Sequence, residues 1–313
     1  MNDAVVTEIV DLNKKSEPKP EVPPELLETT MPMPETYDLT ILPGFIEIIP
    51  ITKKQKEPSP NAIGMFSLGN AKDLKRLFEA INTIVDEVTI KFDMDSLSIR
   101  QMDPSRVAMI DYQIDKRQFE EWHVTKPGLT CFNIESVLDV ALSKLKKDTM
   151  VKVEFNEREI TFTLKDAKER VRTFPLLEPN QEIPPTPQLR FNARYKVIAQ
   201  VLQEDIEDLS KVSDHVVFVG DNENLILKAE GDIVKGQNKH SRGGECILDI
   251  ETSEPSKATY SLSYLTEFFK KGTALSEVTT LEFSTDMPIK ITVQSPQFGD
   301  LHHYLAPRIE TED

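Results

Sequence analysis

The chain has 313 residues, of which 39% are hydrophobic, and a formal net charge of −16 at pH 7. This length is sufficient for two domains that each bury a core. The longest apolar stretch, Thr40 to Ile51, is interrupted by two prolines, a glycine and a glutamate, which excludes a membrane span of roughly 20 apolar residues. The acidic charge argues against nucleic acid as a partner unless the basic residues are concentrated on one surface.

The first 64 residues differ in composition from the rest of the chain. They contain ten of the 21 prolines and little helix or strand periodicity, and they show no basic start followed by an apolar run as a secretory signal has. We therefore expect an intracellular protein whose N-terminal arm, residues 1–64, is disordered or loosely attached. Within the arm, Tyr37 to Ile51 is apolar enough to be a docking peptide or an added edge strand. The alternative is a solvated tail with a few apolar residues.

From Met65 onward, short segments alternate apolar and polar residues, which predicts half-buried antiparallel strands. The first set comprises Val88 to Phe92, Leu97 to Arg100, Val107 to Ile114, Val151 to Phe155 and Ile160 to Leu164. The second set comprises Val216 to Val219, Leu225 to Ala229, Glu245 to Ile250, Thr279 to Ser284 and Ile289 to Gln294. The pattern indicates a β-rich unit that occurs twice in the chain.

Four amphipathic helices are predicted between these strands from apolar residues at i, i+3 and i+4 spacing. Their buried stripes run from Leu74 to Val85, from Ile134 to Leu145, within Ala193 to Leu209, and within Leu262 to Lys271. Each helix follows a short strand and precedes a strand meander, so the order repeats four times.

A proline-rich segment, Thr173 to Arg190, lies between the second and third repeats and predicts an extended connector. We expect domains at 65–174 and 191–313, joined by a connector at 175–190.

Residues that could support catalysis or metal binding show no recognisable spacing. Cys131 and Cys246 stand alone and are predicted to be buried thiols, and no two histidines have the i, i+4 spacing of a helical metal site. The turn Arg242 to Gly244 lacks the ending of a phosphate-binding loop, and no hydrolase or metalloprotease motif occurs. We expect no catalytic residues, no bound metal and no required cofactor.

Several motifs together resemble one family. They are Met102-Asp103-Pro104-Ser105-Arg106-Val107, Val212-Ser213-Asp214, Leu227-Lys228-Ala229-Glu230-Gly231 and Leu305-Ala306-Pro307-Arg308-Ile309-Glu310. In this order they resemble the proliferating cell nuclear antigen family, with the archaeal branch most similar. The resemblance covers Met65 to Glu310, and the N-terminal arm has no counterpart.

The resemblance implies an α+β fold of two similar clamp domains, each with two helices packed on antiparallel sheet. Three such subunits would join head to tail into a closed ring, which leaves no exposed strand edges at the joints. The edge near Lys168 to Phe174 of one subunit would meet Glu230 to Lys239 of the next. The implied function is that of a DNA sliding clamp, a processivity factor in replication and repair, located in the cytoplasm of an archaeon or the nucleus of a eukaryote.

The implied partners are double-stranded DNA, two further copies of the chain, and enzymes that dock through short clamp-binding peptides. These enzymes are a DNA polymerase, a clamp loader, a flap nuclease and a DNA ligase, and no membrane partner is implied. Opening the ring would require a separate ATP-driven loader.

Cations on the outer helix faces become candidates for phosphate contact in the ring's channel, because such contacts are independent of sequence. They are Lys72, Lys75, Arg76, Lys144, Lys146, Lys147, Lys196, Lys270 and Lys271. Taken helix by helix, the same residues read as ordinary solvated faces. The third helix carries Gln200, Gln203, Glu204 and Glu207 outward and is a doubtful DNA contact.

Apolar residues matching the family's peptide-docking pocket form a second candidate site. They are Met102, Val107, Phe191, Pro288, Tyr304, Ala306 and Pro307. The alternative is ordinary core for Met102 and Val107 and an ordinary tail for the last three.

Two other functions remain compatible with the sequence. One is a subunit of a mixed or checkpoint-type clamp, which the acidic third helix and the long arm allow. The other is a peptide-binding scaffold that does not bind DNA.

Overall fold

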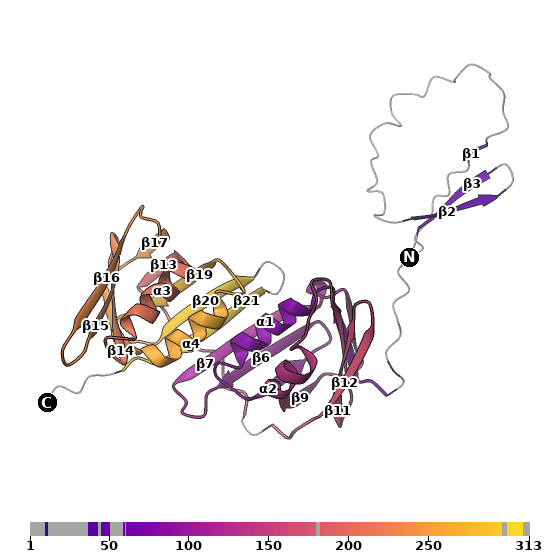
Figure 1. Cartoon of the computed structure of the whole chain (residues 1–313), viewed down its shortest axis with the longest axis horizontal. Coiled ribbons are helices and arrows are strands. Elements are labelled where there is room, and N and C mark those ends of the chain that lie inside the picture. The colour runs from indigo at the N-terminus through magenta and orange to yellow at the C-terminus, as the bar shows by residue number, and fades with distance from the viewer. Residues whose placement is uncertain are drawn as a thin grey trace, which may run out of the picture. The chain divides into compact units, whose positions relative to one another are not determined.

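A computed structural model of the chain describes Ser59 and residues 61–179, 182–295 and 299–308, together with the backbone of three short strands nearer the N-terminus (Figure 1). The chain divides into two compact units, Met1–Glu57 and Pro58–Asp313. Each unit is described by itself.

The described part of the first unit is a small sheet. Strands β1 (Val10–Asp11), β2 (Tyr37–Leu42) and β3 (Phe45–Pro50) pair in the order β1-β3-β2. Strands β2 and β3 pair in antiparallel register from Tyr37 opposite Pro50 to Leu42 opposite Phe45. The apolar segment predicted to dock or to add a strand therefore contains two strands paired with each other. The arm predicted to be disordered or loosely attached, residues 1–64, includes these three strands, Ser59 and residues 61–64, and its other residues lie outside the described residues.

The second unit contains two similar halves. The first half runs β4 (Gly64–Leu68), α1 (Ala71–Ile81), β5 (Glu87–Phe92), β6 (Ser96–Met102), β7 (Ala108–Asp115), a 3₁₀ turn (Lys116–Gln118), β8 (Glu121–Val124), β9 (Gly128–Asn133), α2 (Ile134–Ser136) with a π-helical turn (Val137–Ala141), β10 (Met150–Phe155), β11 (Glu159–Lys165) and β12 (Glu169–Pro175). The second half runs β13 (Ala193–Ile198), α3 (Ala199–Leu209), β14 (His215–Gly220), β15 (Asn224–Glu230), β16 (Lys235–Ser241), β17 (Ile247–Thr252), β18 (Ser256–Ser261), α4 (Leu262–Gly272), β19 (Val278–Phe283), β20 (Ile289–Ser295) and β21 (Gly299–Leu305).

Three sheets support the helices of this unit. Their strand orders are β12-β11-β10-β4-β8, β16-β15-β14-β18 and β17-β13-β19-β20-β21-β7-β6-β5-β9. The nine-stranded sheet crosses from one half to the other, because β21 pairs with β7 from Leu301 opposite Tyr112 to Leu305 opposite Ala108. The two halves therefore share one continuous sheet.

The helices form a continuous row on this scaffold. The π-helical turn after α2 contacts α1, α1 contacts α4, and α4 contacts α3. Figure 1 shows α1 and α4 side by side across the junction of the two halves. The row presents one helical surface built from both halves.

Helix α1 illustrates how the sequence produces this arrangement. The Asn70 side chain accepts a hydrogen bond from the Lys72 backbone N–H and caps the first turn. Leu74, Leu77 and Phe78 are buried, as the i, i+3, i+4 pattern predicts. Each such side chain contributes about 1.5–3 kcal/mol through burial, so truncating Leu77 to alanine would remove more stability than losing the cap.

Two predicted helix boundaries are wrong. Residues 193–198 form strand β13 rather than the start of the third helix, because Ala193, Tyr195 and Val197 are buried with a period of two. The second helix ends at Ala141 in a π-helical turn closed by a hydrogen bond from Leu142 N–H to Val137 O, so the segment from Leu142 to Thr149 is not helical. The ten predicted strands all overlap strands of the structure.

Candidate nucleic-acid and partner interfaces

The cations predicted on the first helix lie on α1, and most are available to solvent. Arg76 is half exposed and lies 3.4 Å from Asp73, while Lys75 lies 3.8 Å from Glu79. Exposed pairs at this spacing contribute only about 0.3–0.5 kcal/mol, so they do not hold these cations against a stronger anionic partner.

Two more predicted cations, Lys270 and Lys271, occupy the last turn of α4. Since α4 packs beside α1, the structure brings these five cations onto neighbouring helices at the junction of the two halves. This helix pair is the basic part of the row.

The three lysines predicted on the second helix lie instead on the segment that follows it. This segment is tied to strand β12, because the Arg170 guanidinium donates from Nη1 to the Lys144 carbonyl at 2.8 Å. Lys146 Nζ lies 3.8 Å from Asp166 Oδ1, and Arg170 Nη2 lies 3.2 Å from the other oxygen of Asp166. Lys144, Lys146 and Lys147 therefore lie beside an edge strand of the five-stranded sheet.

Lys196 is not on a helix. It lies in β13 opposite Asp249 and Thr280, between the buried residues Tyr195 and Val197. Its side chain is therefore on the face of the sheet opposite to α3, because strand residues alternate between faces. The prediction that Lys196 belongs to a helical channel surface is wrong for this reason.

Helix α3 carries an acidic and amide surface, as predicted. Gln200 donates to Glu204 at 3.2 Å and Gln203 donates to Glu207 at 2.7 Å. These residues, with Glu277 and Thr273, line an open groove between α3 and the segment after α4. The carboxylates make this end of the helix row unfavourable for phosphate.

The predicted partner-docking residues gather at one end of the nine-stranded sheet. Phe191 precedes β13, Pro288 precedes β20 and Val107 precedes β7, while Met102 ends β6 and Ala306 and Pro307 follow β21. Antiparallel pairing places these strand ends together, and the Ala306 N–H donates to the Val107 carbonyl at 2.8 Å. All seven predicted residues are partly exposed.

The register aligns four residues of this end into a row across the sheet. Lys290 lies opposite Tyr304, Tyr304 opposite Met109, and Met109 opposite Met102. Sequence reasoning missed Met109 and Lys290, although the alternation along β7 could have placed Met109 on this face. We call these four residues the docking row.

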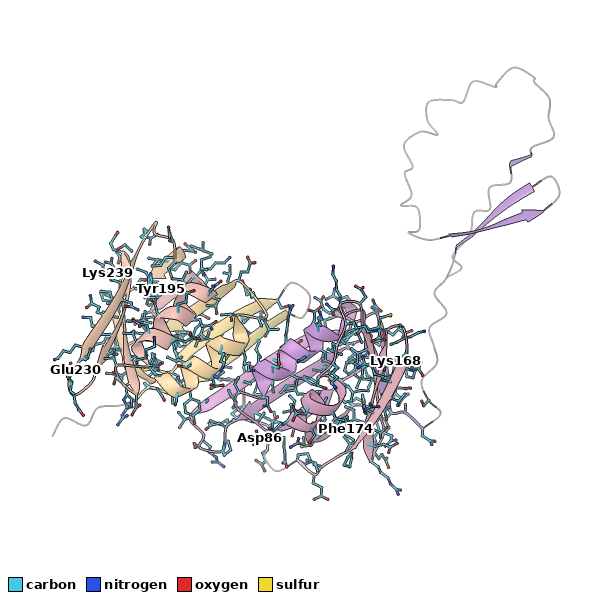
Figure 2. All side chains as sticks on the ribbon, in the orientation of Figure 1. Asp86, Lys168, Phe174, Tyr195, Glu230 and Lys239 are labelled. Carbon is cyan, nitrogen blue, oxygen red and sulfur yellow. The ribbon has the colours of Figure 1, made fainter. Side chains whose placement is uncertain are left out.

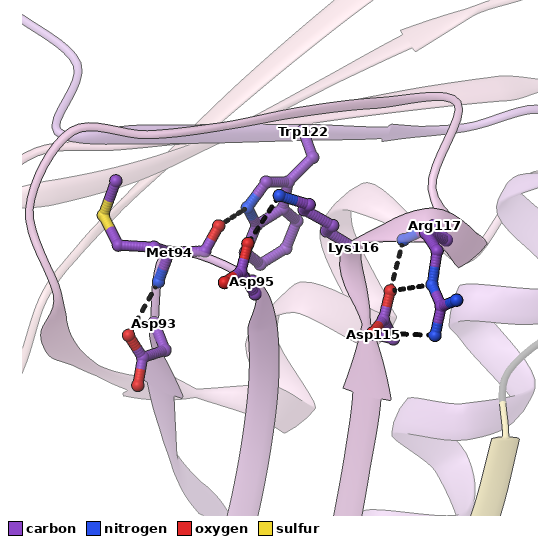
Figure 3. A network of polar contacts seen from close by, with 7 residues as sticks. All are labelled: Asp93, Met94, Asp95, Asp115, Lys116, Arg117 and Trp122. Carbon is purple, nitrogen blue, oxygen red and sulfur yellow. Dashed lines mark hydrogen bonds and ion pairs between the residues drawn. The ribbon is translucent and has the colours of Figure 1, made fainter.

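A polar network lies on the first half, around Trp122 (Figure 3). The Trp122 indole donates to the Met94 carbonyl at 3.0 Å, Lys116 pairs with Asp95, and Arg117 pairs with Asp115 at 2.8 Å. Hydrogen bonds from Arg117 lower the pKa of the Asp115 carboxyl. Because Asp95 and Asp115 each have a cationic partner, the network fixes the β5–β6 turn against the segment before β8 rather than forming a reactive group.

The remaining candidate chemistry is limited. Cys131 and Cys246 are both buried free thiols, which confirms the prediction for them. In the described part of the chain, no group of three or more His, Cys, Asp or Glu side chains is placed to hold a metal ion. None of the helices described is both long and apolar enough to cross a membrane.

Comparison with known proteins gives the family. Residues 65–182 match the description "Proliferating cell nuclear antigen, N-terminal domain", and residues 186–308 match "Proliferating cell nuclear antigen, C-terminal domain". The chain belongs to the proliferating cell nuclear antigen family. The predicted resemblance and the predicted two-domain α+β clamp fold are confirmed.

Two similar proteins in this family come from archaea. The DNA polymerase sliding clamp of Pyrococcus furiosus is 30% identical over 240 residues, covering 77% of this chain and 96% of that protein. The DNA polymerase sliding clamp of Thermofilum pendens is 29% identical over 245 residues, covering 78% and 99%.

Solved structures agree with the fold. The PCNA2–PCNA3 complex of Sulfolobus tokodaii is 27% identical with a TM-score of 0.72, over 79% of this chain and all of that chain. The PCNA of Thermococcus kodakaraensis is 21% identical with a TM-score of 0.74, over 78% and 100%, and supports the fold alone.

Proposed function

We propose that this chain is a subunit of a DNA sliding clamp that encircles duplex DNA and tethers replication and repair enzymes to it. The single observation that carries the proposal, beyond family membership, is the continuous row of helices across both halves, with cations at its centre on α1 and α4. Long flexible cations on such a surface suit phosphate contacts that carry no sequence information. A clamp that slides requires this kind of weak contact.

The DNA surface in this proposal comprises Lys72, Lys75, Arg76, Lys270 and Lys271. Helix α3 does not belong to it, because its outward residues are acids and amides. In a ring, basic stretches would therefore alternate with acidic ones around the channel, so the DNA would contact each subunit mainly at the junction of its halves.

Two edge strands at opposite ends of the clamp body support assembly into a ring. Figure 2 shows Lys168 and Phe174 at one end of the second unit and Glu230 and Lys239 at the other. Among the strands that the structure describes, β12 at the first end pairs with β11 alone, and β16 at the second end pairs with β15 alone. Pairing β12 of one copy with β16 of the next would satisfy both edges.

Cations predominate on the helix side of β12, whereas acids predominate on the surface of α3 beside β16. On the helix side of β12 lie Arg170 and Arg172, next to the segment that carries Lys144, Lys146 and Lys147. On the helix side of β16, Asn238 donates to Asp205 of α3 at 2.8 Å, and His240 pairs with the other oxygen of Asp205. Neighbouring acids of α3 include Glu204 and Asp208, the latter in an exposed pair with Lys211 at 3.6 Å, and in the ring they would face the cations of the adjacent subunit.

This complementarity favours contacts between identical subunits and hence a homotrimer. In this arrangement Lys144, Lys146 and Lys147 contribute to the joint between subunits rather than to the DNA surface.

A ring of different subunits is the second candidate. The Sulfolobus tokodaii structure is a complex of two different PCNA chains and is 27% identical to this one. A heteromeric ring would place the edge of another chain against β16.

The clamp acts by tethering rather than by catalysis. An enzyme held on the ring stays at high effective concentration near the DNA, which raises processivity without new chemistry. A DNA polymerase is the first partner in this proposal. Clamp loader, flap nuclease and DNA ligase would dock at the same end of the nine-stranded sheet through short peptides with apolar anchors. Since the sliding clamps of Pyrococcus furiosus and Thermofilum pendens are archaeal, we place this function in an archaeal cytoplasm.

Retention on circular DNA tests the proposal. Protein loaded onto a nicked circular plasmid by a clamp loader with ATP is separated from free protein by gel filtration at physiological salt. We expect retention on the circle and loss after the plasmid is cut once with a restriction enzyme. Equal retention on circular and linear DNA would indicate ordinary binding and overturn the proposal, and loss from both would favour a scaffold that does not bind DNA.

A further inference from the structure

A second cross-strand row lies two residues along the strands from the docking row. Thr292 is opposite His302, His302 is opposite Asp111, and Asp111 is opposite Arg100. His302 and Tyr304 are two residues apart on β21 and therefore lie on the same face, about 7 Å apart along the strand. An extended peptide anchored over Tyr304 and running along β21 would reach His302 within two of its own residues.

The imidazole of His302 is held in place from one side. Its Nδ1 lies 3.0 Å from the Thr292 hydroxyl, in hydrogen-bond contact. The carboxylate opposite, Asp111, is 3.0 Å from the Arg100 guanidinium and forms an ion pair with it. Among the described residues, Thr292 is the one that hydrogen-bonds the His302 ring, through Nδ1. Nε2 has no such partner among these residues and is not one of their buried polar atoms, so it is accessible to a further partner.

The charges around His302 nearly balance. Burial and the Lys290 ammonium lower the pKa of the imidazole below its usual 6.5, while Asp300, Asp111 and Glu282 act in the opposite direction. Lys290 is itself paired with Glu282 at 3.0 Å, and Arg100 with Asp111. The ring is therefore neutral at pH 7, and its surroundings select neither an acidic nor a basic side chain.

We propose that His302 is an affinity-determining contact of the partner-docking surface, where its Nε2 hydrogen-bonds a main-chain peptide group of the docked segment beside the apolar anchors. A neutral ring can serve a peptide N–H or C=O, since the Thr292 hydroxyl can accept from Nδ1 or donate to it. Extended peptides present main-chain groups at every residue, so the contact adds affinity without restricting partner sequence. The inference rests on the proposed docking row.

Peptide affinity of the full chain tests the proposal. The probe is a fluorescein-labelled clamp-binding peptide of a DNA polymerase, measured by fluorescence anisotropy at pH 7.5. H302L removes the ring nitrogens and retains an apolar side chain, and we expect Kd to rise about 5-fold. H302Q places an amide near the position of Nε2 and should recover most of the affinity. H123Q, an exposed histidine on β8 of another sheet, is the matched control and should leave Kd unchanged.

Proton NMR of the His302 ring distinguishes direct contact with the peptide from a purely structural role. The ring proton resonances of His302 should shift on peptide saturation, and its titration midpoint should change in the bound state. Circular dichroism confirms that each variant is folded.

The variant Y304A separates the two proposals. If Y304A leaves Kd unchanged, the docking row itself is wrong. If Y304A weakens binding while H302L binds like the unsubstituted protein, the contact assigned to His302 is overturned and the docking row stands.

Discussion

The Tyr264 hydroxyl donates a 2.8 Å hydrogen bond to Oδ2 of Asp103, 161 residues away along the chain. Tyr264 belongs to α4 in the second half, and Asp103 follows β6 in the first half. Asp103 is only 4% exposed, and its carboxylate also accepts from the backbone N–H groups of Ser105, Val107 and Ala108. One buried carboxylate therefore closes the turn before β7 and attaches α4 to it.

Removing this carboxylate should cost more than removing the hydroxyl. We expect D103A to lower the free energy of unfolding by about 3–5 kcal/mol, because several buried donors lose their charged acceptor, and Y264F to lower it by about 1–2 kcal/mol. Urea denaturation at pH 7.5 followed by circular dichroism gives both values. A cost for Y264F equal to that for D103A would show that the turn does not depend on the carboxylate.

Low pH should reduce the free energy of unfolding through His303, which lies on β21 where that strand pairs with β7 of the other half. This residue is 1% exposed on β21, its ring centroid is 4.1 Å from that of Phe268, and burial lowers its pKa to about 3. Between pH 6.5 and about 3 the unfolded chain binds a proton that the folded chain does not. Stability is therefore fully present above pH 6.5 and falls as the pH drops, by up to about 1.4 kcal/mol per pH unit from this residue.

The variant H303F tests this effect. Its denaturation midpoint should depend less on pH between 6.5 and 5 than that of the unsubstituted protein. An identical pH dependence for the two proteins would assign the acid sensitivity to other groups.

Reversing charge on α1 should weaken DNA binding. The variant R76E should raise Kd for duplex DNA and reduce the slope of log Kd against log salt concentration, because fewer phosphates are neutralised. The matched control is K257E, which changes the net charge equally on β18, between the buried residues Ser256 and Ala258 and hence on the face away from the helices. Equal effects of the two variants would point to general charge rather than to the helix row.

Charge swaps test the joint between subunits. The double variant K146E/K147E and the double variant E204K/D208K should each shift the protein toward monomer, because each places like charges at the joint. Mixing the two variants should restore attraction at two of the three joints of a mixed ring, and the gain in assembly is measured by analytical ultracentrifugation. If either double variant alone still sediments entirely as a trimer, electrostatic complementarity does not determine assembly.

Strands with a strict two-residue alternation were predictable from the sequence because one face of each is buried. Edge strand β16 was not, since Lys235 to Ser241 is polar on both faces and only the family resemblance indicated its place. The start of the third helix was misassigned because Tyr195, Ile198 and Leu202 fit a helical stripe as well as a strand followed by a helix.

The candidate DNA-binding and docking residues were also only partly predictable from the sequence. The amino-acid types and their helical spacing predicted the cations of α1 and α4. The position of Lys196 was mispredicted, because it lies in strand β13 and not in the helix that was expected there. From the sequence, the adjacent residues His302 and His303 showed only that they lack the spacing of a helical metal site. Their separation, one onto the docking face and one into the core, follows from strand register, which a single sequence does not supply.

The solution mass of the purified full chain by light scattering tests the central account most directly. A closed homomeric ring predicts three times the 35.6 kDa chain mass, unchanged on dilution through the micromolar range. A monomer at all concentrations would contradict the homotrimeric ring and would require that other subunits complete it.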